Sequence, residues 1–170
     1  AGQLRMSLVP GLIETARRNL SRGLTDLAIF EHGSVFVASK AKPSAFPDTA
    51  DKPSEQEIAN IQAGIPSQPK HIAGLFLGSR VSGKSNQKSL ASGIEDALEA
   101  ARVVGFAVGV EFSVRQATPK GLHSGRSANL LVGENIVGVV GELAPSLSKS
   151  RDLPRTVGAV SYTHLQPTRL

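Results

Sequence analysis

Residues 78–85 match the phosphate-binding loop pattern G-x-x-x-x-G-K-[ST]. In this pattern Gly78 and Gly83 allow backbone N–H groups to wrap around phosphate. Lys84 would reach the outer phosphates, and Ser85 would ligate magnesium. The apolar run 71–77 predicts the strand that should precede such a loop. The chemistry that these residue types could perform is nucleotide binding.

The surrounding sequence lacks two features that nucleotide binding needs. A phosphate-binding helix begins at the Gly-Lys-Ser itself, because its N-terminus supplies part of the anion site. Residues 86–89 are instead polar and without helical periodicity. The later apolar run 136–140 leads into Gly141-Glu142 and not into an Asp that would hold magnesium. We therefore interpret the match as a chance one, and keep a nucleotide-binding protein as the alternative.

A second polar cluster occupies residues 123–127. His123 and Arg126, set around Gly125, could bind a phosphate or a carboxylate. The same residues also fit a structural turn, in which Gly125 supplies an unusual backbone angle and Arg126 bonds to neighbouring carbonyl groups. No nucleophile or general base lies nearby in the sequence, which favours the structural interpretation.

The other ionisable residues form no constellation that predicts catalysis or metal binding. The acids at positions 95, 96 and 99 fall on the solvent side of a predicted helix. The four histidines, at positions 32, 71, 123 and 164, lack metal-ligand spacing, and there is no cysteine. We expect no catalytic residue, no metal ligand and no cofactor in this chain.

Composition predicts one soluble domain. The chain has 170 residues and a formal net charge of +5, with 40% hydrophobic residues. A basic protein can contact RNA, but the charges are scattered along the sequence and aromatic residues make up only 4%. A free-standing RNA-binding module is thus a third alternative. No apolar run approaches a membrane span and the chain does not open on a signal peptide, so we expect a cytoplasmic protein without a membrane partner.

Periodicity predicts helices and locally paired strands. A helix should open near Pro10 and stop at Gly23, and residues 27–37 should form a hairpin or a bulged strand pair around Gly33. Residues 38–70 read as a proline-rich connection, in which a capping box at 54–57 starts a short helix that Gly64 ends.

The second half of the chain continues this mixture. We expect a strand at 71–77, a polar loop at 79–89 and a strong amphipathic helix from Leu90 to a stop at Gly105. An alternating strand around 110–114, a hairpin formed by 128–132 and 136–143, and a short helix from Pro145 should follow. The fold class is α+β with a mainly antiparallel sheet.

Four blocks of sequence, in the right order and at the right spacing, resemble the β subunits of bacterial phenylalanine–tRNA ligases. Residues 4–12 resemble the family stretch Leu-Arg-x-Ser-Leu-x-Pro-Gly-Leu, and residues 27–36 resemble a stretch that ends in Phe-Glu-x-Gly-x-Val-Phe. Residues 123–128 look like His-Pro-Gly-Arg-Ser-Ala, and 137–145 look like Ile-Gly-x-x-Gly-Glu-Leu-His-Pro. The residues to which we assign a structural role in these blocks are Pro10, Gly11, Glu31, Gly33, His123, Gly125, Arg126, Gly141 and Glu142.

The resemblance, which is strongest to actinobacterial sequences, implies a fold and a role. It implies a fragment of a module folded like a class II aminoacyl-tRNA synthetase catalytic domain, an antiparallel sheet flanked by helices, here incomplete. In that family the α subunit performs catalysis with phenylalanine, ATP and magnesium. This module of β is non-catalytic and supports the α/β interface of an (αβ)₂ assembly, which binds tRNA.

The last residues do not fit the family. Residues 160–165 correspond to a translation of the transposon end used in sequencing-library adapters. We therefore expect a family module over residues 1–159 and an adapter-derived tail over 160–170, with the natural last strand replaced from Val160 onward. A tail that was never selected to bury a face should pack on nothing specific.

Overall fold

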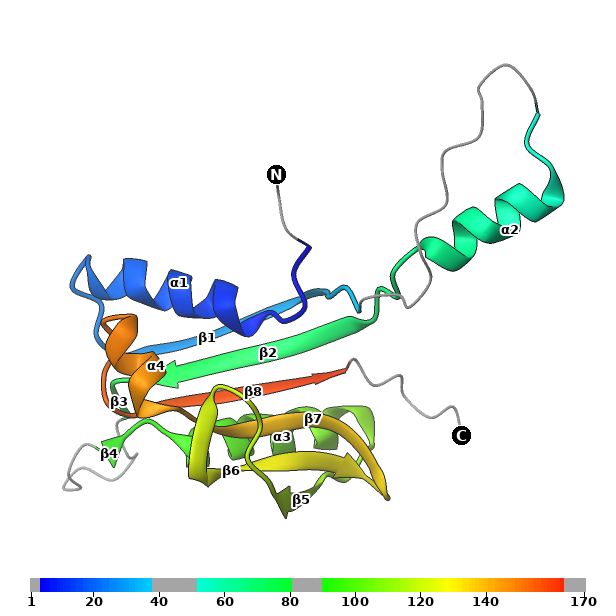
Figure 1. The fold of residues 1–170 in the computed structure, drawn as a ribbon. Helices are drawn as coiled ribbons and strands as arrows, with labels where there is room; N and C mark the ends of the chain where they lie inside the picture. The colour runs from blue at the N-terminus through cyan, green and yellow to red at the C-terminus, as the bar shows by residue number, and fades with distance from the viewer. Residues whose placement is uncertain (1–3, 38–51, 81–89, 164–170) are drawn as a thin grey trace.

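The computed structural model describes residues 4–37, 52–80 and 90–163, and over these ranges the chain folds around one sheet of six strands (Figure 1). The order across the sheet is β1, β2, β8, β7, β6, β5, and each neighbouring pair is antiparallel. This confirms the predicted α+β class. The strands of the sheet are β1 (Leu27–Ser34), β2 (Lys70–Leu77), β5 (Ser113–Gln116), β6 (Leu122–Val132), β7 (Asn135–Leu143) and β8 (Val157–Thr163).

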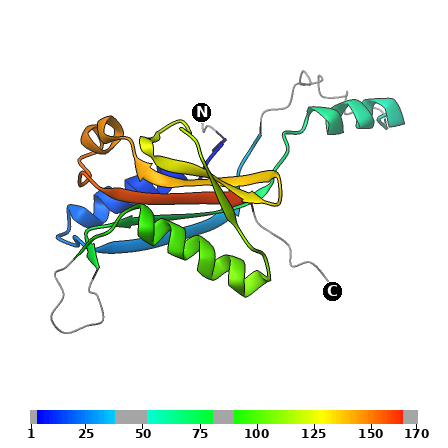
Figure 2. The ribbon, with the colours of Figure 1, turned by 90° about the horizontal axis from the view of Figure 1, so that it is seen from below.

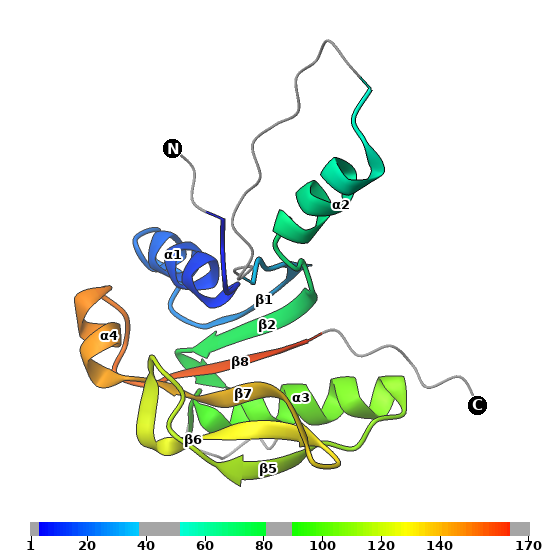
Figure 3. The same ribbon diagram turned by 45° about the vertical axis from the view of Figure 1, so that its right-hand side comes forward.

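Helices lie on both faces of the sheet (Figures 2 and 3). Helix α1 (Val9–Leu20) packs on β1 and β2, and the short helix α4 (Pro145–Ser150) shares its core. Helix α3 (Ile94–Val108) packs on the opposite face, over β8, β7 and β2. Each face therefore has its own hydrophobic core. No helix in the described part of the chain is long and apolar enough to cross a membrane.

Local signals account for α1 and α2. In α1, Pro10 stands in the first turn, where its missing N–H costs nothing, and the buried side is formed by Leu12, Ile13 and Ala16. Helix α2 (Glu55–Gly64) has the predicted capping box: Glu57 N–H donates to Ser54 Oγ at 3.3 Å, and Ser54 N–H donates to Glu57 Oε2 at 2.8 Å. Helix α2 buries no residue, and it projects away from the sheet (Figure 1).

The predicted hairpin at 27–37 is wrong. Residues 27–34 form one uninterrupted strand, β1, which pairs along its whole length with β2, and residues 35–37 lie beyond its end. Gly33 does not bend the chain but lies within the strand, opposite His71. Its lack of a side chain instead makes room for the Arg5 guanidinium, which crosses the strand at this point. The strand's true partner is distant in sequence, so local pattern could not identify it.

The limits predicted for α3 are also wrong. Leu90 belongs to β4 (Leu90–Ala91), which pairs with β3 (Ser79–Arg80), and the helix begins only after Gly93. At the other end it runs past Gly105 and stops at Gly109, whose φ of 70° is the left-handed value that glycine tolerates best. Gly105 is buried, and a Cβ there would lie 3.0 Å from the Phe112 ring. The Phe112 ring packs against the helix at Gly105. Strand β5 begins at Ser113, so the strand expected around 110–114 lies further along the chain.

The loop predicted at 123–127 is part of strand β6. Gly125 has no positive φ; the glycine that makes the turn is Gly121, with a φ of 87°. Pairing of β6 with β7 is irregular between Leu122 and Ser127, so the polar cluster sits on a distorted part of the strand.

The expectation that the chain packs on nothing after residue 159 is wrong for residues 160–163. They complete β8, an inner strand paired with β2 on one side and β7 on the other. Val160 and Tyr162 are 3% and 2% exposed and belong to the core under α3. The backbone groups of β2 and β7 that face each other need a strand between them. The apolar residues of 160–163 can fill this position whether or not the sequence was selected for it. Residues 164–170 of the predicted tail lie outside the described residues.

Candidate functional site

An apolar groove of about 640 Å³ lies between α3 and the outer part of the sheet. Helix α3 covers β8, β7 and the inner side of β2, so this face of the edge strand β1 stays uncovered. Phe30 is 80% exposed on β1, and Val103 is 58% exposed on α3. The groove is lined mainly by Ala28, Phe30, Ile72, Phe76, Val103 and Val104.

Polar side chains on the rim of the groove are engaged with one another. Arg80 pairs with Glu95 at 2.8 Å and with Asp96 at 3.3 Å. Asp96 also accepts a hydrogen bond from Gly93 N–H at 2.9 Å, at the start of α3. Among the described residues, no group of three His, Asp or Glu side chains could hold a metal ion. The groove can therefore bind an apolar surface, and paired charges and His32 stand among its lining residues.

Two predicted structural residues, Glu31 and Gly33, lie against the segment that precedes α1. The Arg5 guanidinium forms an ion pair with Glu31, and Arg5 Nε donates to Ser34 O at 2.9 Å. A Cβ on Gly11 would lie 3.4 Å from Glu31 Oε2, so a glycine there lets the helix approach this pair closely. These contacts attach the start of α1 to β1.

Five other predicted structural residues lie on the paired strands β6 and β7. Arg126 Nε donates to Glu142 Oε2 at 2.6 Å, and the Glu142 side chain is 8% exposed. A Cβ on Gly141 would lie 2.6 Å from Ser127 Cβ, so only glycine fits where the strands approach. His123 Nδ1 accepts a hydrogen bond from Gly125 N–H at 3.0 Å. Arg126 therefore serves a carboxylate of its own chain.

The residues of the phosphate-loop match are only partly described. Gly78 has a φ of 87° and packs against Thr25 and Asp26, and the residues on either side of the loop pair as the antiparallel ribbon β3–β4. Gly83, Lys84 and Ser85 lie outside the described residues. The interpretation of this match as a chance one stays a prediction.

With this geometry in place, the family can be assigned. Residues 1–161 match the family model described as the phenylalanyl tRNA synthetase beta chain CLM domain. The chain belongs to this family. Phenylalanine–tRNA ligase β subunits of Leifsonia xyli subsp. xyli and Corynebacterium jeikeium are 43% and 39% identical to it. The alignments cover 92% and 89% of this chain but 19% and 18% of the relatives, so the chain spans about a fifth of their length.

Solved structures support the fold at much lower sequence identity. A pyrrolysyl-tRNA synthetase from Desulfitobacterium hafniense superposes with a TM-score of 0.58 and 16% identity, covering 94% of this chain and 46% of that one. A second structure of the enzyme from this organism gives a TM-score of 0.55. The class II synthetase fold expected for a phenylalanyl tRNA synthetase β chain is thus confirmed.

Sequence reasoning missed the groove of this β-chain module. Its signals were present: Phe30 is a large apolar residue on a strand that was predicted as half of a local hairpin, and Val103 lies outside the apolar stripe of α3. Neither residue indicates a groove unless it is known that α3 packs on β8, β7 and β2 and leaves β1 uncovered. The same limit hid Tyr162, whose ring lies 5.6 Å from that of Phe112.

Proposed function

We propose that this chain is a non-catalytic, structural part of the β subunit of a cytoplasmic phenylalanine–tRNA ligase. The complete enzyme would use ATP and magnesium to attach phenylalanine to its tRNA. The chain's direct protein partner is the α subunit, in an (αβ)₂ assembly. Family membership supports this proposal, because the relatives are named as β subunits of such a ligase and a β subunit implies a partner subunit.

The observation that carries the interface role is the open apolar groove. Large exposed apolar patches are uncommon on free soluble proteins and mark surfaces that a partner covers. Here Phe30 on the edge strand β1 and Val103 on α3 line one groove. We place the contact with the α subunit in this groove.

The test replaces the groove's exposed apolar residues in a complete subunit. The chain is substituted for the matching region of the Leifsonia xyli β subunit and co-expressed with the α subunit of that organism. Phe30→Ser and Val103→Ser are introduced together. The matched control is Val114→Ser with Ile136→Ser, which are similarly exposed, at 56% and 59%, on β5 and β7.

We expect the groove variant to lose the α subunit on size-exclusion chromatography, and the control variant to keep it. All four positions are exposed, so either pair of substitutions should leave the fold intact. Retention of α by the groove variant, with a drop in the thermal stability of the β subunit alone, would overturn the interface role. That result would mean that another segment of β covers the groove.

A further inference from the structure

The positive charge of this chain is not spread evenly over its surface. Six arginines form ion pairs with described acids. Of the other Lys and Arg side chains that the structure describes, eight have no ion pair with a described residue. Six of these eight lie on α1, in the turn after it, on α4 or in the loops beside α4: Arg18, Arg22, Lys120, Lys149, Arg151 and Arg155. Cations that are far apart in the sequence are thus gathered on neighbouring elements by the fold.

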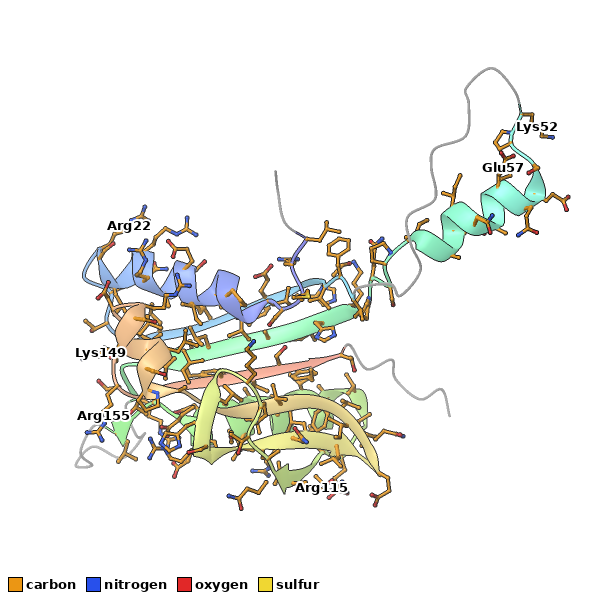
Figure 4. The ribbon with its side chains drawn as sticks, viewed as in Figure 1. Arg22, Lys52, Glu57, Arg115, Lys149 and Arg155 are labelled. Carbon is orange, nitrogen blue, oxygen red and sulfur yellow. The ribbon has the colours of Figure 1, made fainter. Side chains whose placement is uncertain are left out.

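These side chains belong to one end of the molecule. Figure 4 shows Arg22, Lys149 and Arg155 along the end at which α1 finishes, with Lys52 at the far end, beside α2. Lys120 and Arg151 line the same cavity of about 430 Å³ as residues of the first half of α1. We call this surface the basic end, and define it by the six unpaired residues together with Arg17.

Few carboxylates oppose the basic end. Glu14 is paired with Arg17 at 2.8 Å, and Asp26 accepts from Ser79 N–H at 2.7 Å. The third acid, Asp152, follows Arg151 directly. The pKa of Glu14 is lowered, first by its hydrogen bond from Arg17 and then by the charges of Arg17, Arg18 and Arg151. Positive charges on α1 and just after α4 therefore act on the same carboxylate. The seven cations of this surface outnumber these three acids by four, and the carboxylate of Glu142 close to Thr156 is paired with Arg126.

We propose that the basic end binds the phosphate backbone of double-helical RNA, and that its RNA is the tRNA of the ligase. The identity of the RNA as tRNA rests on the proposed function, whereas the binding of helical RNA rests on the charge of this surface alone. All seven cations are exposed, on long side chains that can reach phosphate oxygens. The most exposed aromatic residues, Phe30 and Phe106, lie on β1 and α3, away from these cations. Contact without stacked bases suits a helical stem better than a single strand.

The experiment measures binding of the whole 170-residue chain to fluorescently labelled tRNA by anisotropy, without any α subunit. Salt is varied from about 50 to about 200 mM. The test variant combines Arg22→Gln, Lys149→Gln and Arg155→Gln. The control variant removes the same charge elsewhere, with Lys52→Gln, Lys70→Gln and Arg115→Gln. All six positions are exposed, and circular dichroism melting verifies that each variant keeps the fold.

We expect wild-type affinity to fall steeply with salt, and the test variant to lose about three units of the log–log slope, roughly one for each phosphate contact. The single substitution Arg22→Gln should remove about one unit, and the control variant should keep the wild-type slope. Equal losses in the two triple variants would show an effect of net charge alone and overturn the proposal. Absence of salt-dependent binding by the wild type, or equal competition by poly-glutamate, would also overturn it. None of these results depends on the groove or on the α subunit.

Discussion

Replacing Tyr162 by Ala tests whether residues 160–163 belong to the fold. Tyr162 is 2% exposed, pairs with Ile72 on β2 and Gly138 on β7, and packs its ring against Phe112. Truncating a large buried aromatic residue to Ala costs about 3–5 kcal/mol. Because β8 is fixed by strands on both sides, the surroundings cannot collapse into the space, so we expect the upper half of that range. This is a large share of the roughly 5–15 kcal/mol that holds a typical domain.

The assay is urea unfolding of the 170-residue chain, followed by far-UV circular dichroism at low protein concentration. With a slope of about 2 kcal/mol per molar urea, a loss of about 4 kcal/mol lowers the midpoint by about 2 M. Tyr162→Phe keeps the ring and should cost less than about 1.5 kcal/mol. Removing only residues 164–170 should change stability by less than about 0.5 kcal/mol.

A loss below about 1 kcal/mol for Tyr162→Ala would refute the reasoning, since no buried tyrosine ring is removed so cheaply. Residues 160–163 would then behave as the adapter-derived tail that the sequence suggested. Deletion from Val160 onward offers an independent check. It strips the shared strand from both β2 and β7, and should abolish cooperative unfolding altogether.

Three further outcomes are expected. Arg126→Ala leaves the nearly buried Glu142 without its ion pair and should cost about 1–3 kcal/mol in the same urea assay, whereas Glu142→Gln, which keeps an acceptor for Arg126, should cost less. Partial burial lowers the pKa of His71, so its protonated form is disfavoured in the folded chain; stability should fall as pH drops below about 6.5, and His71→Gln should lose less over that window. We expect no ATP binding by the chain in equilibrium dialysis, and Lys84→Ala should not alter aminoacylation by a complete ligase that carries the chain. Micromolar affinity for ATP that is lost in Lys84→Ala would instead support the nucleotide-binding alternative.

Elements defined by neighbours in sequence were predictable, and those defined by distant partners were not. The periodicity of α1, the capping box of α2 and the hairpin of β6 and β7 all involve residues close along the chain. Strand β1 pairs with β2 across a connection of more than 30 residues, so its pattern suggested a hairpin instead. Strand β8 was missed for the same reason, because only β2 and β7 together create the slot it fills.

The four family blocks illustrate both sides of this limit. The sequence identified Glu31, Arg126 and Glu142 as structural, but could not say what they touch. Arg5 meets Glu31 across 26 residues, and Arg126 meets Glu142 across 16. Gly125 and Gly105 show a second limit: a glycine can mark a turn, a close approach or neither, and its spacing does not decide which.

The two ion pairs join the four family blocks to one another. The first block supplies Arg5 to a glutamate of the second, and the third supplies Arg126 to a glutamate of the fourth. An arginine that recognises a substrate's carboxylate or phosphate must have its guanidinium available to that group. Here both guanidinium groups hold strands and helix starts in place, and six of the eight described cations without an ion pair lie at the basic end. Apolar surface, by contrast, is left open beside α3. The apolar groove and the basic end are thus two separate surfaces, and neither includes Arg5 or Arg126.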